Sequence, residues 1–374
     1  MYTDNGFWDT YRTTFSLFSL LIPEREREML QGFLNFYREE GWLPKWVSPG
    51  ERGIMPGTLI DAVLADAAVK GLLTREQLDQ ALEGMLKNAN VPSGDSLHGR
   101  VGVADYLRLG YVPSDQYRES VNNSLDGYYC DSCIAQVAEL LGKGDVAQEY
   151  RQRSRNYGLL FDEKAGFLRG RKADGSREAH FSSLAWGGEY CEGSAWQNGF
   201  SVYHDVEGLA ALYGGTDKLI EKLDQLFAMP PDFEVGTYPC KIHEMTEMNA
   251  AAFGQCAISN QPSFHLPFLF SALGDRKRTA YWAGRIRDEA FSPDVFPGDE
   301  DNGSMAAWYV FACLGLYPLC PGSGEYVLSE GIPGKIKIHL ENGREVCIVH
   351  NPDASLCRSH ITHREIMAGG TVIL

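Results

Sequence analysis

Three acids crowd one short turn of this chain. Asp299, Glu300 and Asp301 lie in the turn 297–303, directly before the apolar run 305–316. Carboxylates this close together repel one another, so the cluster requires a cation, a shared proton or the free N–H groups of a helix N-terminus. The turn alone fits either a solvated helix cap or a working group of acids.

A fourth acid lies in the sequence YCEGSAWQ at residues 190–197. There Glu192 follows Cys191 and precedes Trp196, and apolar neighbours raise the pKa of a carboxyl group. Glycoside hydrolysis needs one carboxyl group that is protonated and a second that is ionised. The acids therefore favour glycosidase chemistry, with a buried ion pair to an arginine as the alternative for Glu192.

Six blocks of sequence carry a resemblance to a known family. They are YTDNGFWDTYRT (2–13), GWLPKW (41–46), YCEGSAWQ (190–197), HDVEGL (204–209), SNQPSFHLPFLF (259–270) and GDEDNGSMAAWYVFACLGLYPLCPGSGEYV (298–327). In this order they resemble glycoside hydrolase family 92, whose members are calcium-dependent, inverting exo-α-mannosidases. The resemblance implies a mainly α fold, an (α/α)6 toroid with a small C-terminal β appendage. It also implies hydrolysis of terminal α-linked mannose from oligosaccharides, with inversion and calcium assistance.

The resemblance assigns roles to individual residues. Glu192 is expected to be the general acid, and Asp301, with Asp299 sharing the task, the carboxylate that activates water. Glu300 is expected to point away from the site. The expected substrate-binding residues are Trp8, Asp9, Trp196, His204, Gln261 and His265. The expected calcium ligands are Gln197, Asn260 and Asp301, which offer the oxygen donors that calcium prefers.

Structural alternatives stand beside these roles. Amides in loops often cap turns, Trp8 and Asp9 fit a core residue and a helix cap, and His204 fits a structural histidine. The sequence HEMTE at 243–247 lacks the second histidine of a zinc motif, so we assign it no metal.

Three departures from the family pattern bear on function. The β-sandwich domain that precedes the helical domain in family members is absent here, so we expect it to be missing or supplied elsewhere. Asn260-Gln261-Pro262 stands where α-1,2-specific members have His-Glu-Pro, and Leu59 stands where a histidine is common. The linkage is therefore left open.

Two other functions remain as alternatives to a complete mannosidase. One is an inactive or partner-requiring mannose-binding remnant, which the missing domain favours. The other is a different helical-toroid sugar enzyme, such as an epimerase, which relies on paired histidines.

Charge and composition exclude several partners. The chain has 50 acidic and 34 basic residues and a formal net charge of −16, which argues against nucleic acid and against an anionic membrane surface. No apolar run reaches the roughly 20 residues of a membrane span, and the N-terminus does not resemble a signal peptide. The 9 cysteines are an odd number in a large chain and favour reduced thiols. These features indicate a cytoplasmic chain, although family members are often periplasmic or secreted.

Apolar spacing predicts a succession of helices joined by long loops. Pro23 followed by acids starts one helix, and Thr74 with Gln77 makes a capping box ahead of another. Further helices are expected at about 57–70, 115–122, 130–142, 144–157, 205–212, 216–228, 262–273, 276–290 and 303–314.

The pattern changes after residue 324. Apolar residues there alternate with polar ones on both sides of Asn342-Gly343, which predicts a β hairpin. We therefore expect a helical catalytic domain at 1–324 and a small β region packed on it at 325–374.

Overall fold

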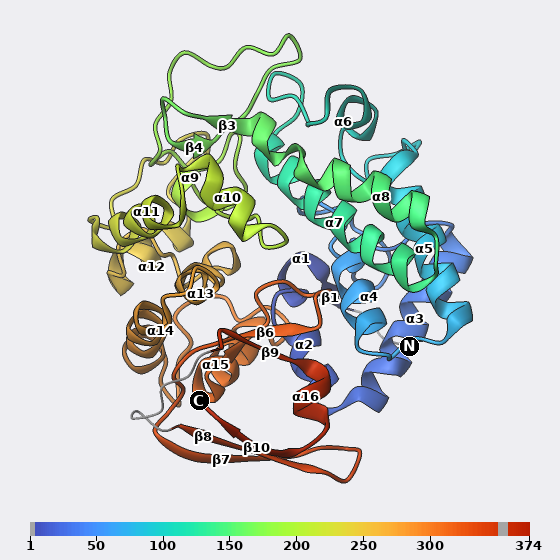
Figure 1. The fold of residues 1–374 in the computed structure, drawn as a ribbon. Helices are drawn as coiled ribbons and strands as arrows, with labels where there is room; N and C mark the ends of the chain where they lie inside the picture. The colour runs from blue at the N-terminus through green and yellow to red at the C-terminus, as the bar shows by residue number, and fades with distance from the viewer. Residues whose placement is uncertain (1–3, 351–357) are drawn as a thin grey trace.

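Helices arranged in a ring make up most of the molecule (Figure 1). The computed structural model describes residues 4–350 and 358–374. The chain passes once around the ring, and the C-terminal strands lie at the bottom of the view. The ring closes where the N-terminus meets the acidic turn, because Thr13 Oγ1 donates to the Ser304 carbonyl at 2.6 Å.

The bounds of the elements are as follows. The first helices are α1 (Phe7–Thr10), α2 (Thr14–Leu21), α3 (Pro23–Glu40), α4 (Ile60–Val69), α5 (Arg75–Asn90), α6 (Val103–Leu109), α7 (Ser120–Leu140) and α8 (Gly144–Arg153). After the 3-10 helix η1 (Ser154–Leu160) come α9 (Ala195–Asn198), α10 (Val206–Leu212), α11 (Thr216–Ala228), α12 (His243–Ala251), η2 (Gln261–Ser263), α13 (Leu266–Ala272), α14 (Arg276–Ala290), α15 (Ser304–Leu314) and α16 (His363–Met367). The strands are β1 (Asn5–Gly6), β2 (Trp46–Val47), β3 (Phe161–Asp162), β4 (Phe167–Leu168), β5 (Leu316–Tyr317), β6 (Glu325–Leu328), β7 (Gly334–His339), β8 (Glu345–His350), β9 (His360–Thr362) and β10 (Gly370–Ile373).

Local signals account for the ends of several helices. Pro23 occupies the first turn of α3, and Gly41 ends that helix in the left-handed conformation with φ 77°. At the start of α5, Gln77 N–H donates to Thr74 Oγ1 at 3.3 Å and Thr74 N–H donates to Gln77 Oε1 at 2.8 Å. The predicted capping box is therefore confirmed.

Helix α7 differs from the prediction of separate helices at 115–122 and 130–142. It is one helix of 21 residues, and it is buried along nearly its whole length. Its polar residues are buried too, because partners satisfy them: Asn122 Nδ2 donates to Asn198 Oδ1 at 2.8 Å, and Asp131 pairs with Arg100. With no solvated face, the helix lacks the apolar period that predictions from sequence rely on.

The C-terminal strands pack on the helical ring as expected. Strands β7 and β8 form an antiparallel hairpin around Asn342-Gly343, and β10 joins β8 in parallel. A second sheet has the order β5-β6-β9, so β5, from the helical part, pairs with β6 of the C-terminal part. Since one sheet joins both parts, the boundary between residues 324 and 325 stays a prediction.

No disulfide links the cysteines of the described residues. The eight cysteines among the described residues are free, and Cys357 lies outside that part of the chain. Cys130 and Cys133 are two buried positions on α7, as expected from their spacing. Within residues 4–350 and 358–374, no helix has both the length and the apolarity that a membrane span requires.

A buried ion-pair network ties α7 to its neighbours and predicts a stability effect. Asp131 is fully buried; it accepts from Arg100 at 2.6 Å, from Tyr106 at 2.6 Å and from Arg153 at 3.1 Å. Asp131→Ala leaves the buried Arg100 without its main partner, so we expect the free energy of unfolding to fall by about 3–5 kcal/mol. Denaturant unfolding measures this.

Asp79→Ala is the matched control for that measurement. Asp79 makes an exposed pair with Lys143 at 3.2 Å, and the loss of such a pair costs less than about 1 kcal/mol. Equal losses in the two variants would contradict a stabilising role for the Asp131 network.

Candidate active site

The loop before α9 presents Glu192. Two side chains hold its backbone: Cys191 N–H donates to Asn122 Oδ1 at 2.9 Å, and Glu192 N–H donates to Tyr238 Oη at 3.1 Å. Glu192 itself has φ 43°, in the left-handed region that residues with side chains rarely occupy. Such strain persists only where surrounding structure enforces it, and it occurs often at functional sites.

The environment of the Glu192 carboxyl favours its protonated form. Burial raises its pKa to about 7, and the negative charges of Glu244 and Asp301 add to this effect. Asn260 opposes it, because Asn260 Nδ2 donates to Glu192 Oε2 at 3.0 Å. A carboxyl group with this pKa can hold a proton near neutral pH and release it to a neighbour.

The acidic turn has an unusual backbone. Asp301 and Asn302 have φ 50° and φ 54°, so two successive non-glycine residues are left-handed just before α15. A Cβ at Gly298 would lie 2.1 Å from the Ser259 carbonyl oxygen, so only glycine allows the turn to pack against the segment before Asn260. The acidic turn is therefore packed tightly against the segment that contains Ser259 and leads to Asn260.

Glu300 has a structural task, in agreement with its expected orientation. Its carboxylate accepts from Gly303 N–H at 2.7 Å and from Ala306 N–H at 3.1 Å, which caps the N-terminus of α15. The remaining acids of the turn, Asp299 and Asp301, are left for other contacts.

Two consecutive amides connect the two groups of acids. Asn260 donates to Glu192, while Gln261 Nε2 donates to Asp301 Oδ2 at 2.6 Å and to the Asp299 carbonyl at 3.1 Å. Burial raises the pKa of Asp301, and the hydrogen bond from Gln261 lowers it. A single turn at η2 thereby fixes the predicted acid and the predicted base relative to one another.

Asp299 makes a different contact, with helix α12. Its Oδ2 lies 2.9 Å from His243 Nε2, and His243 Nδ1 lies 3.3 Å from Glu244 Oε2. The possible ligand atoms of these three residues lie within 4.8 Å of one another. Because each imidazole nitrogen already faces a carboxylate, we assign no metal here. Sequence reasoning missed both residues of α12, since it tested HEMTE only as a zinc motif.

Asp9 on α1 joins the same cluster of acids. It is 3% exposed, and burial raises its pKa well above the usual value. The charges of Asp301 and Glu192 raise its pKa further, whereas Arg12 lowers it. Trp8 lies beside it in the core, with the Arg12 guanidinium 5.0 Å from its ring. The structure thus brings Asp9 together with the acids predicted from the other two blocks.

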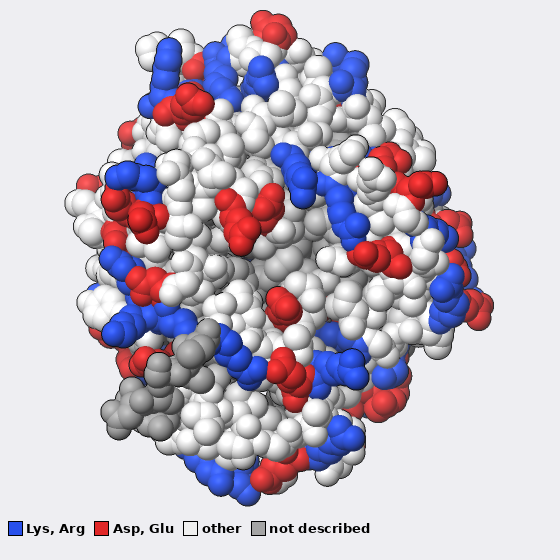
Figure 2. All heavy atoms as spheres, in the orientation of Figure 1, with Lys and Arg blue, Asp and Glu red and all other residues white. Residues whose placement is uncertain are grey.

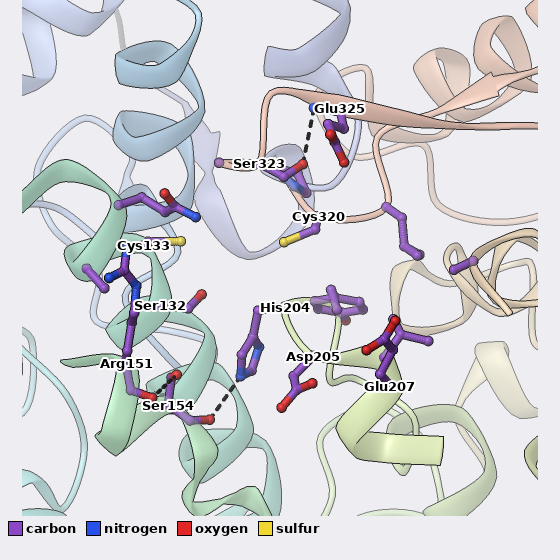
Figure 3. A pocket seen from close by; sticks show the side chains of 18 of the residues that line it. Ser132, Cys133, Arg151, Ser154, His204, Asp205, Glu207, Cys320, Ser323 and Glu325 are labelled. Carbon is purple, nitrogen blue, oxygen red and sulfur yellow. Dashed lines mark hydrogen bonds between the residues drawn. The ribbon is translucent and has the colours of Figure 1, made fainter. Parts of the chain in front are cut away.

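The structure places His204 in another part of the molecule. His204 lines a cavity of about 500 Å³, and its Nε2 contacts the Ser154 carbonyl at 2.9 Å (Figure 3). This cavity is the central hollow visible in Figure 2, and none of the acids of the cluster lines it. Tyr203 also lines the cavity and accepts from Arg12 at 3.0 Å.

The other predicted residues have contacts within the fold. His265 is buried edge-on against Tyr203 at 4.8 Å, and burial lowers its pKa to about 3. Trp196 Nε1 donates to Ser183 at 3.2 Å. Leu59, which stands where family members often have histidine, is 1% exposed in the core.

Gln197 is occupied at both ends of its amide. Its Oε1 accepts from Ser194 N–H at 2.8 Å and from Ser194 Oγ at 2.7 Å, which completes a capping box for α9. Its Nε2 donates to the Gln255 carbonyl at 2.7 Å. These bonds support the fold, and nothing in them supports the predicted role in metal binding.

Comparison with known proteins identifies the family. The chain matches the Glycosyl hydrolase family 92 catalytic domain over residues 1–373. The chain belongs to this family. Its fold is similar to that of an inverting family 92 mannosidase of Bacteroides thetaiotaomicron, with a TM-score of 0.89 and 38% identity over 100% of this chain and 53% of that chain.

Two further comparisons agree with this assignment. An α-mannosidase of the same organism, solved with mannoimidazole, has a TM-score of 0.86 and 26% identity over 98% of this chain and 50% of that chain. An uncharacterized secreted glycosidase of Arthroderma benhamiae is 28% identical over 333 residues, which are 79% of this chain and 39% of that protein. The chain thus spans about half the length of these solved relatives. The likenesses confirm the predicted family and the mainly α, (α/α)6 toroid with small sheets.

The raised pKa of Glu192 predicts how stability depends on pH. Folding raises this pKa from the usual 4.5 to about 7, so the folded state binds the proton more tightly than the unfolded state. The resulting stability is complete below pH 4.5 and is lost as pH rises through about 7. Each tenfold change in proton affinity corresponds to about 1.4 kcal/mol, so the loss reaches about 3 kcal/mol.

Glu192→Gln removes this dependence. In the presence of a chelator, we expect the variant to match the wild type near pH 4 and to exceed its free energy of unfolding by up to about 3 kcal/mol near pH 8. Urea unfolding at several pH values measures the difference. A constant difference across this range would show that Glu192 has an ordinary pKa.

Proposed function

We propose that this chain is the catalytic domain of an inverting exo-α-mannosidase. The observation that carries the proposal is the pairing of two unlike carboxyl groups, Glu192 and Asp301, by the adjacent amides Asn260 and Gln261. Family membership and the two mannosidases among the solved relatives support the same reaction. The chain covers about half of those relatives, so the activity of the whole protein is part of the proposal.

The residues divide the work of hydrolysis. Glu192 gives its proton to the glycosidic oxygen as the bond from that oxygen to the anomeric carbon breaks. Water attacks the anomeric carbon from the opposite face and loses a proton to Asp301, with Asp299 holding the water. Burial raises the pKa of Asp301, and the hydrogen bond from Gln261 opposes this effect and so favours the ionised form that this role requires. The product is mannose of inverted anomeric configuration.

Calcium fits the oxygen atoms at this site. Gln261 is fully buried, and its Oε1 has no hydrogen-bond partner in the fold. A buried carbonyl oxygen in this state, beside the Asp301 carboxylate and the Asn260 amide, offers the ligands that calcium prefers. Asn260, Gln261 and Asp301 would therefore hold the ion. Asn260 Oδ1 accepts one hydrogen bond, from Gln261 N–H at 2.9 Å, whereas Gln197 Oε1 accepts two, from Ser194, so we prefer Asn260 and Gln261 to the predicted Gln197. Bound calcium would supply a positive charge that grips vicinal hydroxyls of the flattened sugar ring.

The terminal mannose would lie between these groups and α1. Asp9 can accept hydrogen bonds from sugar hydroxyls, and the neighbouring Trp8 supports it from the core. His204 lines the separate cavity of about 500 Å³, which none of these acids lines, so our proposal does not include it as a substrate contact. The linkage that the enzyme cleaves stays open.

We also propose that a domain outside this chain completes the site. The Asp299 side chain is 57% exposed, which is high for a group that orients a water molecule. The solved relatives are about twice as long as this chain, which leaves room for such a domain. The greater length of the solved relatives also favours the second candidate function, a chain that binds mannose and hydrolyses substrate only together with its partner domain.

Release of mannose from α-linked mannobioses tests the proposal. We expect this chain to release β-mannose, the inverted anomer, with calcium and to lose the activity with a chelator. NMR of the first product formed identifies the anomer. Retention of the α configuration would contradict the inverting mechanism, and calcium-dependent mannose binding without release would support the second candidate.

Two variants test the roles of the carboxyl groups. Glu192→Gln and Asp301→Asn each remove one proton-transfer group while keeping its shape, so we expect kcat to fall by about 100- to 10,000-fold. Steady-state kinetics on an aryl α-mannoside distinguish the role of general acid from the role of general base. A good leaving group needs little protonation, so it should rescue Glu192→Gln but not Asp301→Asn, and equal rescue would contradict the assignment.

A further inference from the structure

Helix α12 begins with a histidine that the proposed mechanism does not use. His243, its first residue, lies between two carboxylates from different elements: Asp299 of the acidic turn at 2.9 Å and Glu244 of α12 at 3.3 Å. Glu244 is 8% exposed, and its Oε2 has no hydrogen-bond partner; its contact with His243 is an ion-pair distance only. The ring therefore bridges an exposed carboxylate and a buried one.

The surroundings of His243 favour its charged form. The hydrogen bond to Asp299 raises the pKa of His243, and the charges of Glu244, Asp299 and Glu247 raise it further, against a smaller opposing effect of burial. Asp299 faces the ring from the acidic turn, and Glu244 and Glu247 face it from α12 itself. A neutral imidazole donates from one nitrogen only, whereas the protonated ring donates from both. Protonation thus keeps the Nε2 hydrogen bond to Asp299 and adds a charge attraction between Nδ1 and the Glu244 carboxylate.

We propose that His243 is a positioning residue that holds Asp299 ready to orient the attacking water. Donation from Nε2 fixes one carboxylate oxygen of Asp299, and the charge of the buried Glu244, 3.3 Å from Nδ1, holds the ring in place. The inference rests on the proposed function, because Asp299 acts there.

The need for such a residue follows from the position of Asp299. Its side chain is 57% exposed and lies near Asp301, whose pKa its charge raises. Repulsion between the two carboxylates would turn Asp299 toward solvent unless a donor held it. Small displacements of a positioned group cost rate even where binding is unchanged.

His243→Gln tests the role in catalysis. Glutamine keeps a donor but carries no charge, so we expect kcat to fall by about 10- to 100-fold with little change in KM. The alkaline side of the pH profile of kcat/KM should also change. Loss of the His243 proton adds a drop of about 10- to 100-fold to the fall caused by Glu192, so the alkaline limb of the wild type should be steeper than about −1 before it returns to about −1, whereas the limb of the variant should have a slope of about −1 throughout.

Asn249→Ala is the matched control on the same helix. Asn249 is exposed, and its side chain donates to the Pro231 carbonyl at 3.2 Å. We expect this variant to keep the kcat and the pH profile of the wild type. If His243→Gln also keeps both, or if the two variants lose activity equally, the inference is overturned.

An NMR titration of His243 tests its contacts with Asp299 and Glu244 without a measurement of enzymatic activity. The imidazole C–H signal is assigned by its loss in His243→Gln, and we expect it to titrate above the ordinary value of about 6.5 in the wild type. Asp299→Asn and Glu244→Gln should each lower that value. An ordinary value that neither substitution moves would overturn the inference. If the chain releases no mannose, the proposed function fails in this chain while the titration still decides whether the bridge exists.

Discussion

The concentration of carboxyl groups at one site is the constraint on which the rest of this structure depends. Asp9, Glu192, Glu244, Asp299 and Asp301 come from four separate segments, and each raises the cost of placing the others nearby. Burial adds to that cost. The fold offsets it with the paired amides and the imidazole of His243. A large apolar core that runs from α1 to the last strand supports most of these elements, and a second, smaller cluster of Trp186, Met245, Met248 and Ala257 lies under α12.

Much of the scaffold could be predicted because its signals are local. The capping box at Thr74 and the hairpin at Asn342-Gly343 depend on residues three or fewer positions apart, and both are present. Helix α7 could not be outlined in this way. Its buried Asn122 and Asp131 form hydrogen bonds with Asn198 and Arg100, which lie far away in the sequence. From its sequence alone the helix therefore looks polar, although it lies in the centre of the core.

The site was predicted in part, and the omissions have physical reasons. The acids stood out by composition and by family resemblance, and the structure brings Asp9, Glu192, Asp299 and Asp301 together. His243 was missed because its importance comes from a carboxylate 56 residues away. The structural role of Gln197 could have been found, since Ser194 and Gln197 have the spacing of a capping box. His204 precedes Asp205, which caps α10, and this pattern indicates a place in the scaffold.

The turn that carries Asn260 and Gln261 has a consequence for how this family can diverge. Because neighbouring residues reach the two reacting carboxyl groups, the spacing between acid and base is set by one dipeptide, and Pro262 stiffens the turn that follows. In glycosidases this spacing separates inversion from retention. On the proposed mechanism, loops around the cluster can therefore be exchanged, and with them the glycan that fits. The backbone of the turn, which ends in proline here and in the His-Glu-Pro pattern, would meanwhile hold the two carboxyl groups at one separation.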